Sequence, residues 1–387
     1  MADVFDYLAW RGELTLAQSP FNCVDALILS VLAYMSFGDA APGGEAVELG
    51  TAAQALLARG EGEPGARNGT DRRLLEALAG SARFCGMRLL ACEECVDPRR
   101  EMQFGAFTAL TGDGAVFVAY RGTDNTLVGW KEDLNMSFAP VVAGQRRAVQ
   151  YLERAAGMAP GPLRLGGHSK GGNLAVYAGA FCAPETQARI EAVFNNDGPG
   201  FAPEVLEAGG YRNILPRVQA FVPQTSIVGM LMGHGDDYTV VRSDQVGIMQ
   251  HDPYTWQVLG PDFVRLEQVT AGSRLVDRAL KDWLAGLTRE ERERFVDAVF
   301  GVLEATGAVT VRQLVDPHNA RVLVRAMTGV DEKTRAMLLR VLSALASSAG
   351  RAVRQAAAPG HRLRPETGDG AALPGGAAGQ QEPAKPG

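Results

Sequence analysis

The sequence predicts an α/β fold with a mainly parallel central sheet, followed by a helical C-terminal extension. From about residue 100 to about residue 225, strand-like and helix-like runs alternate, which is typical of βαβ units. Within this region "LRLGGHSKGGNLAVYAG", Leu163 to Gly179, joins a β-type segment to a helix-type segment across one serine between glycines. Beyond about residue 270 the pattern is wholly helical. The 387 residues, 46% of them hydrophobic, are enough to bury a sizeable core.

The N-terminal part predicts one buried helix and a hairpin. The apolar run from Phe21 to Phe37 is too short and too interrupted for a membrane span, so we expect a buried helix. The glycine-rich stretch 38–71 indicates a loop with one short helix over 52–58. Two apolar segments, Phe104 to Leu110 and Ala115 to Tyr120, are joined by "TGDG" and predict adjacent strands.

The alternating region then predicts, in order, a helix over 144–157, a strand over 163–167, a helix over 171–182, and strands over 190–197 and 217–223. In the C-terminal region Thr288 and Glu291 form a capping-box pattern before a helix with Phe295, Val299 and Leu303 on one face. A second helix is expected over 332–350. The expected organisation is an N-terminal helical element (1–37), a variable loop and helix insert (38–80), an α/β core (81–265), a helical C-terminal region (270–350) and a disordered tail (358–387).

Composition narrows the classes of partner and compartment. The net charge is −6 and no basic stripe with interleaved aromatics occurs, so nucleic acid is not an expected partner. The acidic start "MADVFDYLAWRGELT" lacks the pattern of a secretory signal, and the number of cysteines, five, is odd, which favours a reducing compartment. Cys92 and Cys95 form "CEEC" without a second pair or a nearby histidine for zinc. We therefore expect a cytoplasmic protein with no metal or organic cofactor.

The segment from Gly167 to Gly171 matches G-x-S-x-G in the context that this motif requires, an apolar strand before it and a helix, Asn173 to Phe181, after it. In this strained turn only small neighbours let the helix start close to the strand. We therefore interpret Ser169 as a nucleophile; the alternative is an ordinary helix cap.

A nucleophilic serine needs a base and an acid, which follow it in the chain as Asp or Glu and then His. Of the five histidines we favour His251, in a loop-like segment after the sheet strands. The others are His168 inside the turn, His234 in an apparent loop, His318 in the helical region and His361 in the tail. For the acid we favour Asp197, at the end of the strand "IEAVFNND"; its rivals are Asp236, Asp237, Asp244 and Asp252.

An oxyanion hole needs backbone N–H groups where negative charge develops. The residue after the nucleophile, Lys170, supplies the first, and its charged side chain is expected to face solvent. The second is expected from Thr123, where the strand ending at Tyr120 is followed by Gly122. The alternative for Thr123 is a turn or cap residue.

Several of these segments resemble known families. "VAYRGTDNTLVGWKED" and "GGHSKGGNLAVYAG" resemble the strand-end R-G-[ST], W-x-x-D and G-H-S-x-G-G segments of class 3 lipases. Together with "DYLAWRGELTLAQSPFNCVDALILSVLAYMSF", "MQFGAFTAL", "FNNDGPGF" and "IMQHDPYTW", they resemble the bacterial Mbeg-like family of lipase-related α/β-hydrolases over roughly residues 1 to 260. The resemblance implies an α/β-hydrolase fold with Ser169 as nucleophile, His251 as base and Thr123 at the oxyanion position. It departs from class 3 lipases where their triad aspartate stands, since this chain offers Thr225 or Ser226 there.

The expected function is that of a serine hydrolase cleaving carboxylic esters, with acyl lipids as the favoured substrates. The apolar segment Thr225 to Gly233 is either an acyl-binding wall or lid, or a core segment. The alternatives are a non-catalytic hydrolase-like scaffold whose C-terminal helices bind a protein, and a thioesterase or peptidase with the same triad.

Overall fold

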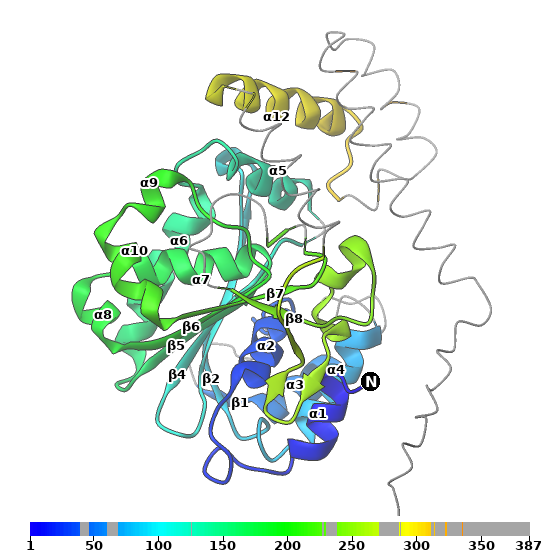
Figure 1. The fold of residues 1–387 in the computed structure, drawn as a ribbon, viewed down its shortest axis with the longest axis vertical. Coiled ribbons are helices and arrows are strands. Elements are labelled where there is room, and N and C mark those ends of the chain that lie inside the picture. The colour runs from blue at the N-terminus through cyan, green and yellow to red at the C-terminus, as the bar shows by residue number, and fades with distance from the viewer. Residues whose placement is uncertain are drawn as a thin grey trace, which may run out of the picture.

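Within the residues described, nine strands form one central sheet (Figure 1). The computed structural model describes residues 1–38, 46–59, 69–124, 126–226, 228–229, 238–270, 286, 288–310, 313, 322 and 335. The strand order is β1-β2-β3-β4-β5-β6-β7-β8-β11. Strands β4 to β8 run parallel, while β1 to β4 and the pair β8 and β11 are antiparallel. The expected α/β architecture with a mainly parallel centre is therefore confirmed.

The strands of this sheet are β1 (Val47–Glu48), β2 (Arg88–Asp97), β3 (Met102–Leu110), β4 (Val116–Tyr120), β5 (Leu163–His168), β6 (Ile190–Asn196), β7 (Val218–Pro223), β8 (Thr239–Val241) and β11 (Arg265–Leu266). A separate antiparallel pair is formed by β9 (Val258–Leu259) and β10 (Asp262–Phe263). The parallel strands β4, β5, β6 and β7 place their carboxyl ends at one edge of the sheet, where ligands bind in open α/β sheets.

Helices cover both faces of the sheet (Figure 1). One face carries α1 (Val4–Arg11), α2 (Cys23–Leu32), α3 (Leu49–Leu57) and α4 (Gly69–Ala79). The other carries α6 (Ala143–Met158), α7 (Lys170–Phe181), α9 (Pro203–Leu206) and α10 (Gly209–Ile214), with α8 (Pro184–Arg189) leading into β6. Successive side chains of β4 pack on opposite faces of the sheet: Phe117 belongs to the core on the first face and Val118 to the core on the second.

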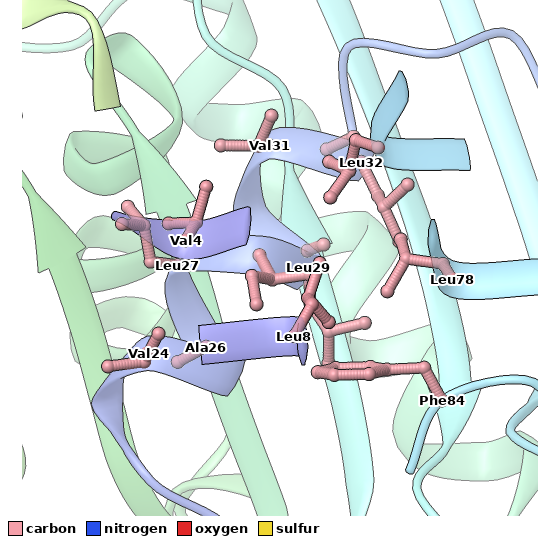
Figure 2. Close-up of a cluster of buried hydrophobic side chains, with 14 of the residues drawn as sticks. Val4, Leu8, Val24, Ala26, Leu27, Leu29, Val31, Leu32, Leu78 and Phe84 are labelled. Carbon is pink, nitrogen blue, oxygen red and sulfur yellow. The ribbon is translucent and has the colours of Figure 1, made fainter. Parts of the chain in front are cut away.

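The first face is built around α2, and all ten residues of this helix are buried. Figure 2 shows its Leu27, Leu29 and Leu32 packed among side chains of α1, α4 and Phe84. The prediction of a buried helix here is confirmed. Among the helices in the described part of the chain, none is both long and apolar enough to cross a membrane.

Most predicted elements are confirmed, with shifted ends. The hairpin forms with Leu110 opposite Val116, and the helix over 144–157 is α6. Helix α7 begins at Lys170, directly after Ser169, and not at Asn173. Helix α4 begins inside the stretch expected to be loop.

The strand β2 was not predicted, because its charges hide the strand pattern. Glu93 forms ion pairs with Arg147 and Arg154, and Glu94 pairs with Arg121 at 2.9 Å. These partners lie far away in the sequence, so a local pattern cannot reveal that the charges are neutralised.

The C-terminal helix α12 (Arg289–Glu304) packs against α5 (Leu127–Asn135) (Figure 1). Its capping box is present as predicted, with Thr288 Oγ1 accepting from the Glu291 N–H at 3.2 Å. The fully buried positions include Val296 and Phe300, and the predicted stripe of Phe295, Val299 and Leu303 is partly buried beside them. The predicted second helix, apart from Arg335, and the tail lie outside the described residues, and the domain boundaries stay predictions.

Candidate active site

Ser169 occupies a strained turn between β5 and α7. Its φ of 59° and ψ of −133° lie in a region that non-glycine residues rarely adopt, at a cost of about 1–3 kcal/mol. Its N–H donates to the carbonyl oxygen of Asn196 at 2.9 Å, which ties the turn to the end of β6. The turn exposes part of the serine at the carboxyl edge of the sheet.

The glycines around this serine are needed for close backbone approach. A Cβ on Gly167 would lie 2.1 Å from the carbonyl carbon and oxygen of Gly171, and one on Gly171 would lie 2.1 Å from the carbonyl oxygen of Tyr120. These distances are far below van der Waals contact. The glycines therefore allow α7 to start immediately beside β4 and β5, as the sequence motif predicts.

Asp197 and His251 lie together at the same edge. Nδ1 of His251 is 2.6 Å from Oδ2 of Asp197, whose side chain is fully buried, whereas the His251 side chain is 25% exposed. A carboxylate only accepts hydrogen bonds, so Nδ1 carries the proton and Nε2 is left as an acceptor. The other oxygen of Asp197 accepts from Ser226 Oγ at 2.5 Å and from the Gly229 N–H at 3.1 Å.

Ser226 stands after β7, where the sequence departs from the class 3 lipase pattern. In the structure it donates to Asp197 instead of replacing it. Thr225 binds elsewhere, with its N–H donating to Gln250 Oε1 at 2.7 Å. Thus the one carboxylate that contacts His251 among the described residues comes from the strand before β7.

The two rival aspartates that the structure describes, Asp244 and Asp252, make other contacts. Asp244 accepts from Gln257 Nε2, and Asp252 accepts from the Tyr254 N–H at 3.1 Å as a helix cap. The other candidate acids and histidines lie outside the described residues; they are His234, Asp236, Asp237, His318 and His361. Most of the predicted apolar wall or lid, Thr225 to Gly233, lies outside them as well.

The expectation that the side chain of Lys170 faces solvent is wrong. This side chain is 1% exposed and its Nζ contacts Glu132 Oε2 at 2.9 Å, Gln103 Oε1 at 2.6 Å and the Gln103 carbonyl oxygen at 2.8 Å. Glu132 also accepts from the N–H groups of Gln103 and Gly144. The ammonium is buried because a complete set of acceptors surrounds it, which removes most of the desolvation cost.

Thr123 follows β4, and its hydroxyl donates to Asp133 Oδ2. Burial raises the pKa of Asp133 to about 6, against the positive charge of Lys170 and the hydrogen bond from Thr123, which lower it. Its other oxygen, Oδ1, is buried without a hydrogen-bond partner among the described residues. No local pattern predicts a role for Glu132 or Asp133, since only the fold brings them to the turn.

His168, the residue before the nucleophile candidate, is 4% exposed. Its Nε2 lies 2.8 Å from the carbonyl oxygen of His251, and its Nδ1 lies 3.0 Å from the hydroxyl of Tyr34. The imidazole rings of His168 and His251 are 4.5 Å apart between centroids. His168 is not expected to act as a base, and the sequence does not predict these contacts because they join residues 134 and 83 positions apart.

The strand order, the serine turn and the Asp–His pair define an α/β-hydrolase fold. Within the described residues, no group of three or more His, Cys, Asp or Glu side chains could hold a metal ion. A family model described as Mbeg1-like matches residues 78–301, more than half of the chain. The protein therefore belongs to the Mbeg1-like family.

Solved structures that are similar to the chain, among them lipases, match it at low sequence identity. A mutant form of MDLA from Penicillium cyclopium is 12% identical over 64% of this chain and 86% of its own, with a TM-score of 0.37. Lipase II from Rhizopus niveus is 12% identical over 47% and 74%, with a TM-score of 0.32. A deletion mutant of the Rhizomucor miehei lipase propeptide complex is 14% identical over 53% of this chain and 66% of its own, with a TM-score of 0.34. A comparison with curated proteins finds no match.

Proposed function

We propose that the protein is a serine hydrolase that cleaves carboxylic esters, with Ser169 as nucleophile, His251 as base and Asp197 as the acid that orients it. The observation that carries this proposal is the 2.6 Å contact between the buried carboxylate of Asp197 and Nδ1 of His251. The strained serine turn is tied to the same place, because the Ser169 N–H donates to Asn196, the residue before Asp197. The chain order of serine, aspartate and histidine is that of α/β-hydrolases.

In the proposed reaction Ser169 Oγ attacks the ester carbonyl carbon while Nε2 of His251 takes the hydroxyl proton. The carbonyl oxygen becomes an oxyanion that accepts from the backbone N–H groups of Thr123 and Lys170. The intermediate collapses when the alcohol leaves with the proton from His251. Water, activated by the same imidazole, then hydrolyses the acyl ester of Ser169 and restores the serine.

Exposed apolar side chains near these residues in the chain support a hydrophobic acyl group as the substrate. Met249, two residues before His251, is 45% exposed, and Trp130, on the helix that follows Thr123, is 46% exposed. Because a site for an apolar partner is a contiguous apolar patch, the proposal requires a bound acyl chain to contact both side chains. Acyl lipids and other long-chain esters are therefore the first substrates to examine.

The test is labelling with a fluorophosphonate probe, with the adduct located by mass spectrometry. We expect labelling of the wild-type protein at Ser169 and none in Ser169→Ala. His251→Ala should label slowly because it removes the base that takes the serine proton. Asp197→Asn should also label slowly, because loss of the orienting acid costs about 10⁴-fold in kcat in a Ser-His-Asp enzyme. Ser137→Ala is the matched control, since that serine donates only to the Leu134 carbonyl in a helix-end turn.

A folded wild-type protein that takes no label would contradict the proposal and favour a non-catalytic scaffold. If Ser169 labels, a panel of p-nitrophenyl esters, thioesters and amides of increasing acyl length compares the three substrate classes directly. Faster hydrolysis of thioesters or amides than of esters would reassign the reaction while keeping the triad.

A further inference from the structure

Two hydrogen-bonded contacts link the catalytic histidine proposed above to the N-terminal part of the chain. His251 ends the short 3₁₀ helix Gly247–His251, and its ring is held at Nδ1 by Asp197. Its main chain is contacted separately, because His168 Nε2 lies 2.8 Å from its carbonyl oxygen. His168 in turn contacts Tyr34, which follows α2.

We infer that His168 is a positioning residue that fixes the backbone of His251, with Tyr34 fixing His168. A carbonyl oxygen can only accept, so Nε2 of His168 carries a proton and donates to His251. In the neutral ring Nδ1 is then an acceptor, and the Tyr34 hydroxyl donates to it at 3.0 Å. The phenol hydroxyl, which can donate or accept, thus complements the tautomer that the His251 carbonyl requires.

Burial and close packing both favour the hydrogen bonds of His168 to His251 and to Tyr34 over hydrogen bonds to water. His168 and Tyr34 are both buried, so water does not readily replace either hydrogen bond. A Cβ on Gly122 would lie 2.0 Å from the Tyr34 hydroxyl and 2.5 Å from the His168 carbonyl oxygen. The absence of a side chain at Gly122, one residue before Thr123, gives Tyr34 access to His168.

The arrangement assigns two constraints to one catalytic side chain. Asp197 sets the direction of the imidazole, and His168 sets the position of the main chain that carries it. His168 directly precedes Ser169, so nucleophile and base are held by neighbouring residues of one turn. A displacement of about 1 Å in a catalytic group can lower the rate by about 100-fold, so loss of this contact should be visible in the rate.

This inference rests on the proposed function, and its test starts from the wild-type rate of phosphonylation at Ser169. We expect His168→Leu to label at least tenfold more slowly, with KM for an ester substrate nearly unchanged because His168 is not proposed to touch substrate. His168→Gln keeps an N–H donor at a similar reach and should recover most of the rate. Thermal unfolding of each variant checks that it is folded.

The variant Tyr34→Phe distinguishes a positioning role of His168 from a general loss of structure, through the rate of labelling at Ser169. It should slow labelling in the wild-type background and have no further effect in His168→Leu, because Tyr34 acts through His168. Labelling of folded His168→Leu within twofold of the wild-type rate would overturn the inference, and so would additive effects of the two substitutions.

An NMR measurement separates this inference from the proposed function. The Nδ1 proton of His251, shared with Asp197 at 2.6 Å, should give a strongly deshielded resonance. We expect it to shift or vanish in His168→Leu and to persist in His168→Gln, whether or not Ser169 takes the label. An unchanged resonance in His168→Leu would refute the positioning role, whereas a wild-type protein that shows it but takes no label would refute only the hydrolase proposal.

Discussion

Replacing Lys170 with methionine should destabilise the protein strongly, because Lys170 and Glu132 form an ion pair with side chains 1% and 0% exposed. Removing one partner of such a pair costs about 3–5 kcal/mol. Glu132 keeps the N–H donors of Gln103 and Gly144, which limits the cost, while two oxygens of Gln103 lose a donor, which adds to it. We expect a loss of about 4 kcal/mol in the free energy of unfolding.

The assay is urea unfolding followed by far-UV circular dichroism, with thermal unfolding alongside. A loss of this size corresponds to a fall in Tm of about 10 °C for a domain of this size. Lys131→Met is the matched control, because Lys131 pairs with Glu101 and Asp297 near the surface and such pairs contribute about 0–1 kcal/mol.

A double variant distinguishes an unpaired charge from lost packing. Lys170→Met combined with Glu132→Gln leaves no buried charge in the pair, so it should recover at least half of the lost stability. The reasoning is refuted if Lys170→Met lies within 1 kcal/mol of the wild type, or if the double variant is less stable than the single one.

Two further predictions concern the neighbouring groups. The folded-state pKa of Asp133, about 6, exceeds the ordinary 3.8, so its stabilising contribution is present below pH 4 and is lost as pH rises through 6. Asp133→Asn should therefore gain up to about 3 kcal/mol relative to wild type between pH 4 and pH 7 in urea titrations; a constant difference would contradict this. Gly122→Ala should cost about 1–3 kcal/mol because its Cβ meets the His168 carbonyl. Gly157→Ala, on an exposed helix position with free space, should stabilise by about 0.5–1 kcal/mol in the same thermal assay, and equal effects at both glycines would refute the steric argument.

Local patterns were sufficient to predict the centre of the sheet, β3 to β7, and the serine turn. The hairpin at β3 and β4, the helix α6 and the strand–turn–helix around Ser169 each carry their signal within about 20 residues, through periodicity and glycine placement. Asp197 could be predicted to lie at the carboxyl edge of the sheet, because it follows β6 and parallel strands end at one edge.

The partners of buried charges could not be predicted in this way. A lysine in a glycine-rich turn ordinarily faces water, and only the fold shows that Glu132 and Gln103 surround Lys170. The contact of Tyr34 with His168 joins positions 134 residues apart and has no sequence periodicity. Charge and hydrogen-bond partners over such separations depend on the packing of several elements together.

Residues at the N-terminus contact a segment that is synthesised more than 200 residues later, which orders the steps of assembly during translation. The carbonyl oxygen of Ala2 accepts from the Val258 N–H at 2.9 Å, and the ring of Phe5 stacks on Tyr254 at 5.7 Å. At 5–20 residues per second, translation takes on the order of tens of seconds to span the interval between these partners. The segment carrying His251 packs on the N-terminal helix only after that delay. The growing chain therefore contains the serine turn well before His251 can reach it.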